Sequence, residues 1–195
     1  AGAAINDDAA DGTVAIGYGA GVSYVPTGDA TSGGTVLIGY NAGNDGNDAA
    51  HGLTTGKQNT AVGHQTLGAN ANAALTGDGN AVMGYRAGYG LTGGAAYNTL
   101  VGRVAGDGIT SGIGNTCIGN SSDAGTNSYS NAIGYAAETQ NNYETRIGYY
   151  GGFQFYSRLV TCDLGGAAED DPAHAVPIGK IPQHSVLLKA TAVVT

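Results

Sequence analysis

The chain has 195 residues, of which 36 are glycine and only 11% are charged, so its composition fits neither a long solvated helix nor a charged tail. Glycine follows no strict three-residue period, which excludes collagen. The formal net charge is −8 and the 7 Lys and Arg are scattered, so the sequence offers no basic stripe for nucleic acid, no polybasic patch for a membrane surface and no apolar run long enough to span one.

An acidic, alanine-rich lead-in occupies residues 1–12, and one short phrase then repeats over residues 13–152. One copy reads Asn80-Ala81-Val82-Met83-Gly84-Tyr85, with an apolar pair before a marker glycine. The interval between markers shortens from 24 residues (Gly39 to Gly63) to 14 (Gly134 to Gly148). A phrase repeated in this way predicts an all-β, parallel β-solenoid of about eight coils, with one strand in each coil. The markers are Gly17, Gly39, Gly63, Gly84, Gly102, Gly119, Gly134 and Gly148.

Two apolar columns precede the markers. Successive residues of a strand face opposite sides, so we expect one column inside the coil and the other against a neighbouring chain. On this expectation, an aspartate at Ala61 or Val82 breaks assembly more than folding. The expected coil core is Ile16, Ile38, Val62, Met83, Val101, Ile118, Ile133 and Ile147. The expected inter-chain face is Ala15, Leu37, Ala61, Val82, Leu100, Cys117 and Ala132, and the last copy has Arg146 instead.

A polar column lies four residues before each marker and consists of Thr13, Thr35, Asn59, Asn80, Asn98, Asn115, Ser130 and Glu144. Asn, Ser and Thr bond local backbone, and a stacked column of them also bonds from coil to coil. A second phrase begins at Leu53, Leu75, Leu91 and Ile109, and it predicts another short strand or corner in the longer coils.

The composition changes after the repeats. Both phenylalanines, Phe153 and Phe155, lie just beyond them, and residues 185–195 form a long run rich in β-branched residues. Residues 153–195 are therefore predicted to be a C-terminal β segment, part of a β-sandwich or of a sheet shared between chains.

The phrases Ser130-Asn131-Ala132-Ile133-Gly134 and Asn59-Thr60-Ala61-Val62-Gly63 resemble the head repeats of trimeric autotransporter adhesins and related repeats of phage tail and head fibres. The resemblance covers about residues 13–152. It implies a left-handed parallel β-roll, three chains side by side, and no catalysis in the roll. The long early coils, and the lack of a recognisable helical stalk or anchor, favour a phage fibre. The expected partners are two further copies and other virion proteins, and the expected location is the virion, with the bacterial surface as the alternative.

Residues that could carry chemistry form no clear site. His51, His64, His174 and His184 contain no tight metal pair, and the Asp/Asn loops fit solvated turns better than Ca²⁺ sites. The carboxylates occupy no fixed strand position and the phrase Gly-x-Ser-x-Gly is missing, so we expect no enzyme activity, metal or cofactor. Cys117 and Cys162 are favoured as lone buried thiols over a disulfide.

Five tyrosines directly follow a marker glycine: Tyr18, Tyr40, Tyr85, Tyr135 and Tyr149. They either pack over the turns or form an aromatic ladder that contacts sugar rings or another protein. The first functional hypothesis is a rigid trimeric spacer in a virion fibre. The second is an attachment protein that binds host surface glycans through its loops or these tyrosines. The third and least favoured is a polysaccharide depolymerase.

Overall fold

The computed structural model describes residues 12–25, 34–44, 52–68 and 73–149, all within the first of two compact units, Ala1–Arg158. Nearly all of the lead-in, and the C-terminal segment predicted over residues 153–195, lie outside the described residues.

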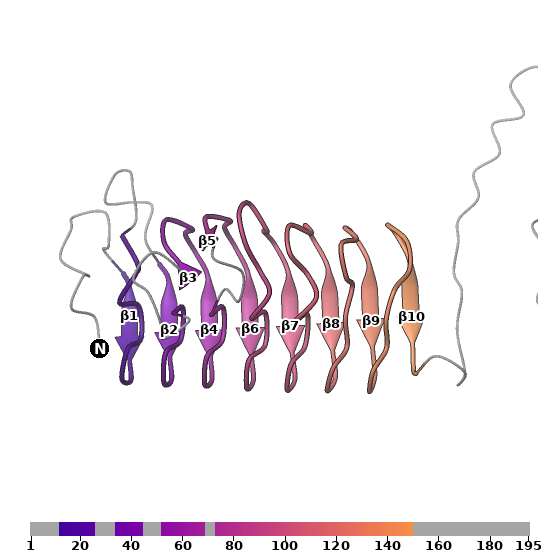
Figure 1. The fold of residues 1–195 in the computed structure, drawn as a ribbon, viewed down its shortest axis with the longest axis horizontal. Helices are drawn as coiled ribbons and strands as arrows, with labels where there is room; N and C mark the ends of the chain where they lie inside the picture. Colours follow the sequence, from indigo (N-terminus) through magenta and orange to yellow (C-terminus); the bar gives the residue numbers. More distant parts are fainter. Residues whose placement is uncertain (1–11, 26–33, 45–51, 69–72, 150–195) are drawn as a thin grey trace, which may run out of the picture. The chain divides into compact units, whose positions relative to one another are not determined.

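Eight short strands form one parallel sheet in the order β1-β2-β4-β6-β7-β8-β9-β10 (Figure 1). Their register places the residues before each marker opposite one another, as in the pairs Ala61↔Val82 and Val82↔Leu100. The described residues contain no helix and make about six turns of a β-solenoid, fewer than the eight coils expected. The strands are β1 Val14–Ile16, β2 Val36–Ile38, β4 Thr60–Val62, β6 Ala81–Met83, β7 Thr99–Val101, β8 Thr116–Ile118, β9 Asn131–Ile133 and β10 Thr145–Ile147.

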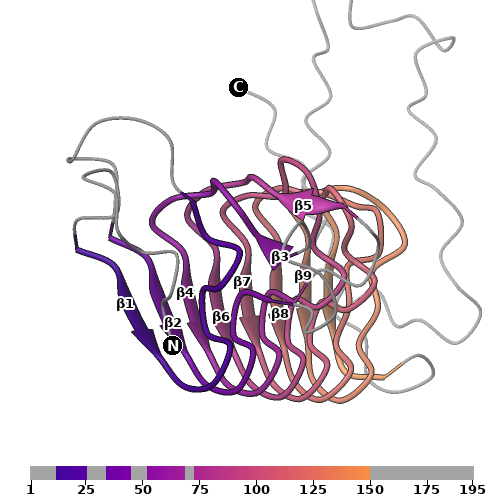
Figure 2. The ribbon, with the colours of Figure 1, turned by 60° about the vertical axis from the view of Figure 1, so that its left-hand side comes forward.

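The second phrase of the longer coils forms the predicted second strand. β3 (Gly52–Leu53) pairs in parallel with β5 (Ala74–Leu75), and a single bridge continues from Leu75 to Gly93. Figure 2 shows that β3 and β5 belong to the segments that connect strands of the main sheet. The apolar residue that begins each copy of this phrase is fully buried, so the phrase supplies one wall of the core: Leu53, Leu75, Leu91 and Ile109.

The expected assignment of the two strand faces is wrong. The residue at the centre of each strand points into the coil: Leu37, Ala61, Val82, Leu100, Cys117 and Ala132 are buried, and Ala15 packs against them. The column expected inside the coil lies on the outer face instead. Ile16 and Met83 expose 56% and 53% of their surface, Val101, Ile118 and Ile147 are also exposed, and Ile38, Val62 and Ile133 are partly buried.

The inner column is set by the polar column beside it. Residues two apart in a strand share a face, so the strand-centre residues lie on the same side as the asparagines, which are buried. The opposite wall carries small residues three positions after each marker, such as Ala42, Ala87 and Ala105. Apolar and amide side chains together therefore fill a narrow interior, and the larger β-branched residues remain outside.

The marker glycines allow the coils to stack directly. All eight have positive φ, from 91° at Gly148 to 140° at Gly63 and Gly102. A Cβ on Gly102 would run into the carbonyl oxygen of Gly119 in the next coil. Both the backbone conformation and the close approach therefore require glycine at this corner.

Candidate interaction surface

The polar column bonds from coil to coil, as the sequence predicts. The Asn59 Oδ1 atom accepts hydrogen bonds from the backbone N–H and the side-chain amide of Asn80, at 2.8 and 2.9 Å. Asn98 repeats this contact with Asn80, and the series continues through Asn115 to the backbone N–H of Ser130. Each buried amide is satisfied by its neighbours, so this column fixes the coil spacing from inside.

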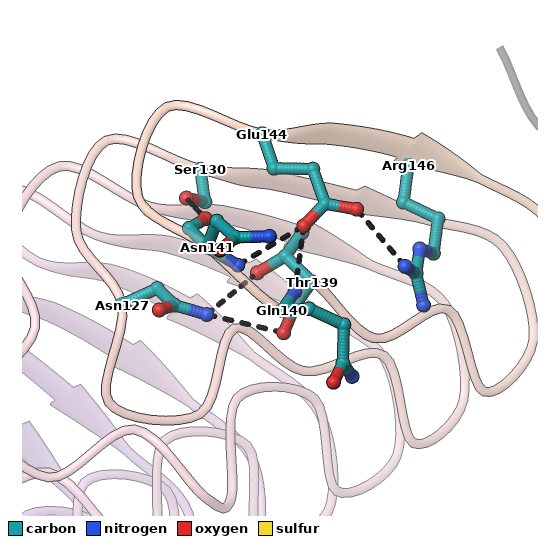
Figure 3. Close-up of polar contacts among 7 residues, drawn as sticks. All are labelled: Asn127, Ser130, Thr139, Gln140, Asn141, Glu144 and Arg146. Carbon is teal, nitrogen blue, oxygen red and sulfur yellow. Dashed lines mark hydrogen bonds and ion pairs between the residues drawn. The ribbon is translucent and has the colours of Figure 1, made fainter. Parts of the chain in front are cut away.

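The last described coil replaces this pattern with an ion pair (Figure 3). One Glu144 carboxylate oxygen accepts hydrogen bonds from the backbone N–H groups of Gln140 and Asn141, at 2.7 and 3.0 Å. The other oxygen lies 3.0 Å from the guanidinium of Arg146, which occupies the strand-centre position. Glu144 therefore holds the turn before β10 through the backbone N–H groups of Gln140 and Asn141, and it pairs with the buried Arg146 side chain. An apolar residue at position 144 would leave these N–H groups without an acceptor.

The outer face of the sheet carries the residues that precede the markers. We call Ile16, Ile38, Val62, Met83, Val101, Ile118, Ile133 and Ile147 the isoleucine column. The strands are parallel and in register, so successive side chains of this column are about 4.8 Å apart. Eight strands therefore present a continuous apolar row about 34 Å long.

An aromatic ladder borders the isoleucine column. The rings of Tyr18 and Tyr40 stack with their centroids 5.5 Å apart, and His64 lies between Tyr40 and Tyr85 at 4.9 and 5.3 Å. The Arg103 guanidinium lies 5.5 Å from the centre of the Tyr85 ring. Sequence reasoning found the tyrosines but missed His64 and Arg103, although both directly follow a marker glycine.

The ladder continues at the other end of the sheet, where the rings of Tyr135 and Tyr149 are tilted and 6.4 Å apart. All five predicted tyrosines are exposed, but stacking brings together only Tyr18, Tyr40 and Tyr85, through His64. Within that stack most ring faces contact another ring, so the edges and hydroxyl groups are what remain for solvent. A sugar ring binds an aromatic face, so this stack is poorly suited to glycan binding.

A second set of tyrosines lies at the corner just before the asparagine column. These corner tyrosines, Tyr97, Tyr129 and Tyr143, have φ values of 59°, 58° and 60°. The coils on both sides of Tyr97 have glycines at this position, Gly79 and Gly114, and an earlier coil has Gln58. The rings of Tyr129 and Tyr143 stack at 5.2 Å, whereas Tyr97 has no ring partner among the described residues. The sequence analysis missed this set, and its only signal was the position of each tyrosine directly before Asn98, Ser130 or Glu144.

Cys117 and Asp123 have raised pKa values, and burial is the main cause in both. Burial, followed by the nearby Asp123 charge, raises the pKa of the free Cys117 thiol to about 12. Burial also raises the pKa of Asp123, whose carboxylate accepts hydrogen bonds from the backbone N–H groups of Gly108 and Gly125. Asp78, from one of the acidic loops, accepts a hydrogen bond from the Lys57 backbone N–H at 2.7 Å. The carboxylates of Asp78 and Asp123 therefore hold backbone N–H groups of nearby turns, which is a structural role.

No group of three or more His, Cys, Asp or Glu within the described ranges is arranged to hold a metal ion. Of the four histidines only His64 is described; His51, His174, His184 and Cys162 lie outside. Among the described residues there is also no helix that could cross a membrane.

Comparison of the chain with family models, with curated proteins and with solved structures gives no significant match. The fold and its outer face therefore carry the functional argument.

Proposed function

We propose that the chain is a rigid, non-catalytic element of a virion fibre or appendage, in which three copies associate as left-handed β-rolls and connect to other virion proteins. The virion assignment rests on the resemblance of the repeated phrase to phage fibre repeats. The association rests on the isoleucine column, and this exposed apolar row is the observation that carries the proposal.

The isoleucine column is unusual for a surface in water. Scattered exposed apolar residues are normal, but a contiguous row along a whole sheet is typical of an interaction site. The position of Ile16, Met83 and Ile118 on the outer face moves the expected inter-chain contact from the strand-centre residues to this column.

The free energy gained by burying the isoleucine column is large enough to support association. Five residues of the column expose between 37% and 56% of their surface, and burying the rest of each gains roughly 1 kcal/mol, with a smaller gain for the three that are partly buried. The column then contributes about 6 kcal/mol per chain, which falls within the range of about 4–15 kcal/mol for the cost of lost translational and rotational freedom.

A further copy of the same chain is the partner that this column fits best. Any partner must present apolar side chains at the same repeat of about 4.8 Å along the same length. Another in-register parallel solenoid does so without distortion, and closed cyclic symmetry buries the column in every copy.

Sedimentation equilibrium of the full chain tests the proposal. We expect a trimer, and we expect Ile118→Asp to dissociate it while the circular dichroism spectrum keeps its β signal. Thr126→Ala, an exposed turn change away from the column, is the control and should remain trimeric. A wild-type monomer at micromolar concentration contradicts the proposal.

A further inference from the structure

Two of the corner tyrosines lie in alternate coils, on either side of a glycine. Tyr97 precedes β7, Gly114 precedes β8 and Tyr129 precedes β9. Because Gly114 has no side chain, the column of corner residues has a gap one coil wide between the two rings. Tyr97 and Tyr129 are 67% and 52% exposed, so solvent reaches both sides of this gap. We propose that the gap binds a pyranose ring of a neutral saccharide, which goes beyond the spacer role proposed above.

The separation of the two rings follows from their matching positions. A Cβ on Gly79 would lie 2.8 Å from the Tyr97 Cδ1 atom, and a Cβ on Gly114 would lie 2.9 Å from the Tyr129 Cδ1 atom. Each ring therefore leans over the glycine of the preceding coil in the same way. The two rings are related by two coil steps, which separates them by about 9.5 Å.

This separation selects the thickness of the ligand. A flat aromatic ring in contact with both faces needs the tyrosines only about 7–8 Å apart, because carbon atoms in contact are about 3.5–4 Å apart. A puckered saturated ring carries axial hydrogens on both faces and fills the wider space. The gap therefore fits a sugar ring held between two aromatic faces better than a base or a phenyl group.

The backbone at this corner has a positive φ in other coils too, so it does not itself call for tyrosine. A bulky residue at φ near 60° is strained by about 1 kcal/mol or more relative to glycine. The same corner holds Gly34, Gly79 and Gly114 in other coils, and Gln58 with a φ of 56°, so the fold does not require tyrosine there. Tyr97 has no ring partner among the described residues, so stacking on a neighbouring ring does not account for its position.

The border of the gap is polar and uncharged. Thr99 and Thr116 follow Tyr97 and Gly114 by two residues in the same coils, and neither hydroxyl has a hydrogen-bond partner within the described residues. Aromatic faces beside free hydroxyl groups match a ring that has apolar C–H faces and a polar rim. The absence of charge on these five residues favours a neutral sugar over a sulfated or phosphorylated one.

Saturation-transfer NMR on the assembled full chain tests this assignment. The probes are the methyl pyranosides of glucose, galactose, mannose and N-acetylglucosamine. We expect transfer to the ring protons of at least one probe, and at least about tenfold weaker binding for Tyr97→Ala and Tyr129→Ala, since each change removes one aromatic face. Tyr97→Phe keeps the face and should bind within about threefold of wild type. Tyr18→Ala removes an exposed tyrosine far from the gap, and this variant should bind the probes as the wild type does.

Sedimentation and thermal unfolding of each variant separate binding from folding and from assembly. Loss of transfer in a Tyr97→Ala protein with wild-type mass and wild-type unfolding temperature supports the site, whatever the oligomeric state proves to be. If no probe receives transfer from the wild-type protein, or if both alanine variants bind as wild type does, the assignment is overturned and the spacer role is unaffected.

Discussion

The side-chain oxygen of Asn80 accepts two hydrogen bonds from Asn98, one from its backbone N–H at 3.1 Å and one from its amide nitrogen at 3.0 Å. Both residues are buried. The contact joins successive coils through side chain and backbone together, so the column acts as an internal ladder parallel to the strand pairing of the sheet.

Asn98→Ala should lower the free energy of unfolding by about 3 kcal/mol. The change leaves the Gly112 carbonyl and the Asn115 backbone N–H without their partners, and each buried unpaired group costs about 1–3 kcal/mol. Urea denaturation measures the loss, with the exposed Thr126→Ala as the control. A loss below about 0.5 kcal/mol would show that water molecules bond the Gly112 carbonyl and the Asn115 N–H in place of the Asn98 side chain.

Val82→Asp should disrupt folding and Met83→Asp should disrupt association, although the two residues are adjacent in the chain. Val82 is buried in the coil, so a carboxylate there prevents folding. Met83 lies on the outer face, so its replacement should leave the β signal intact and reduce the mass in solution. This reverses the sequence-based expectation that Val82→Asp would act mainly on assembly. Circular dichroism and sedimentation of both variants decide, and a folded Val82→Asp protein would contradict the assignment of faces.

Gly102→Ala and Gly94→Ala should differ by several kcal/mol in stability. The first substitution combines a φ of 140° with a collision against the Gly119 carbonyl, so we expect a loss of about 3 kcal/mol or more. A Cβ on Gly94 meets nothing within 4 Å, so that change should be neutral or should stabilise by about 0.5 kcal/mol. Thermal unfolding of the pair measures the difference, and equal stability of the two variants would refute the tight corner.

The Cys117 thiol should resist alkylation in the folded protein. It is fully buried, and its pKa of about 12 keeps it protonated at pH 8, where the reactive thiolate is needed. Iodoacetamide should therefore modify the Cys117 peptide only as fast as the protein unfolds, as followed by mass spectrometry. Labelling in denaturant is the positive control, and rapid labelling of the native chain would contradict the buried position.

The same thiol gives stability a pH dependence. The unfolded thiol ionises near its ordinary pKa of 9.0, while the folded thiol keeps its proton up to about pH 12. The unfolded state therefore loses its proton first, and this contribution to stability, complete below pH 9, falls as the pH rises from 9 to 12. Cys117→Ala, which matches Ala61 and Ala132 in the same column, should remove that part of the decline in urea denaturation at high pH.

The sequence by itself determined the strand positions, their register, the hydrogen-bonded asparagine column and the second strand of the longer coils. Each depends on spacing along the chain: the marker glycine must occur where a coil turns, and residues at equal offsets from it must stack. The marker offset also located every member of the aromatic ladder, although only its tyrosines were recognised as such.

Only the tertiary structure decided which face of the strands lies inside. Both columns beside the marker are apolar, and side-chain size pointed to the larger column, Ile16 and its equivalents. The width of the coil reverses that choice: the buried amides of Asn80 and Asn98 share the interior with strand-centre residues such as Ala61 and Val82. A two-residue period ties these columns to one face, so the isoleucine column and its bordering rings are left on the surface. The stacking of His64 between tyrosines, and the gap at Gly114, likewise depend on contacts between coils that no single coil contains.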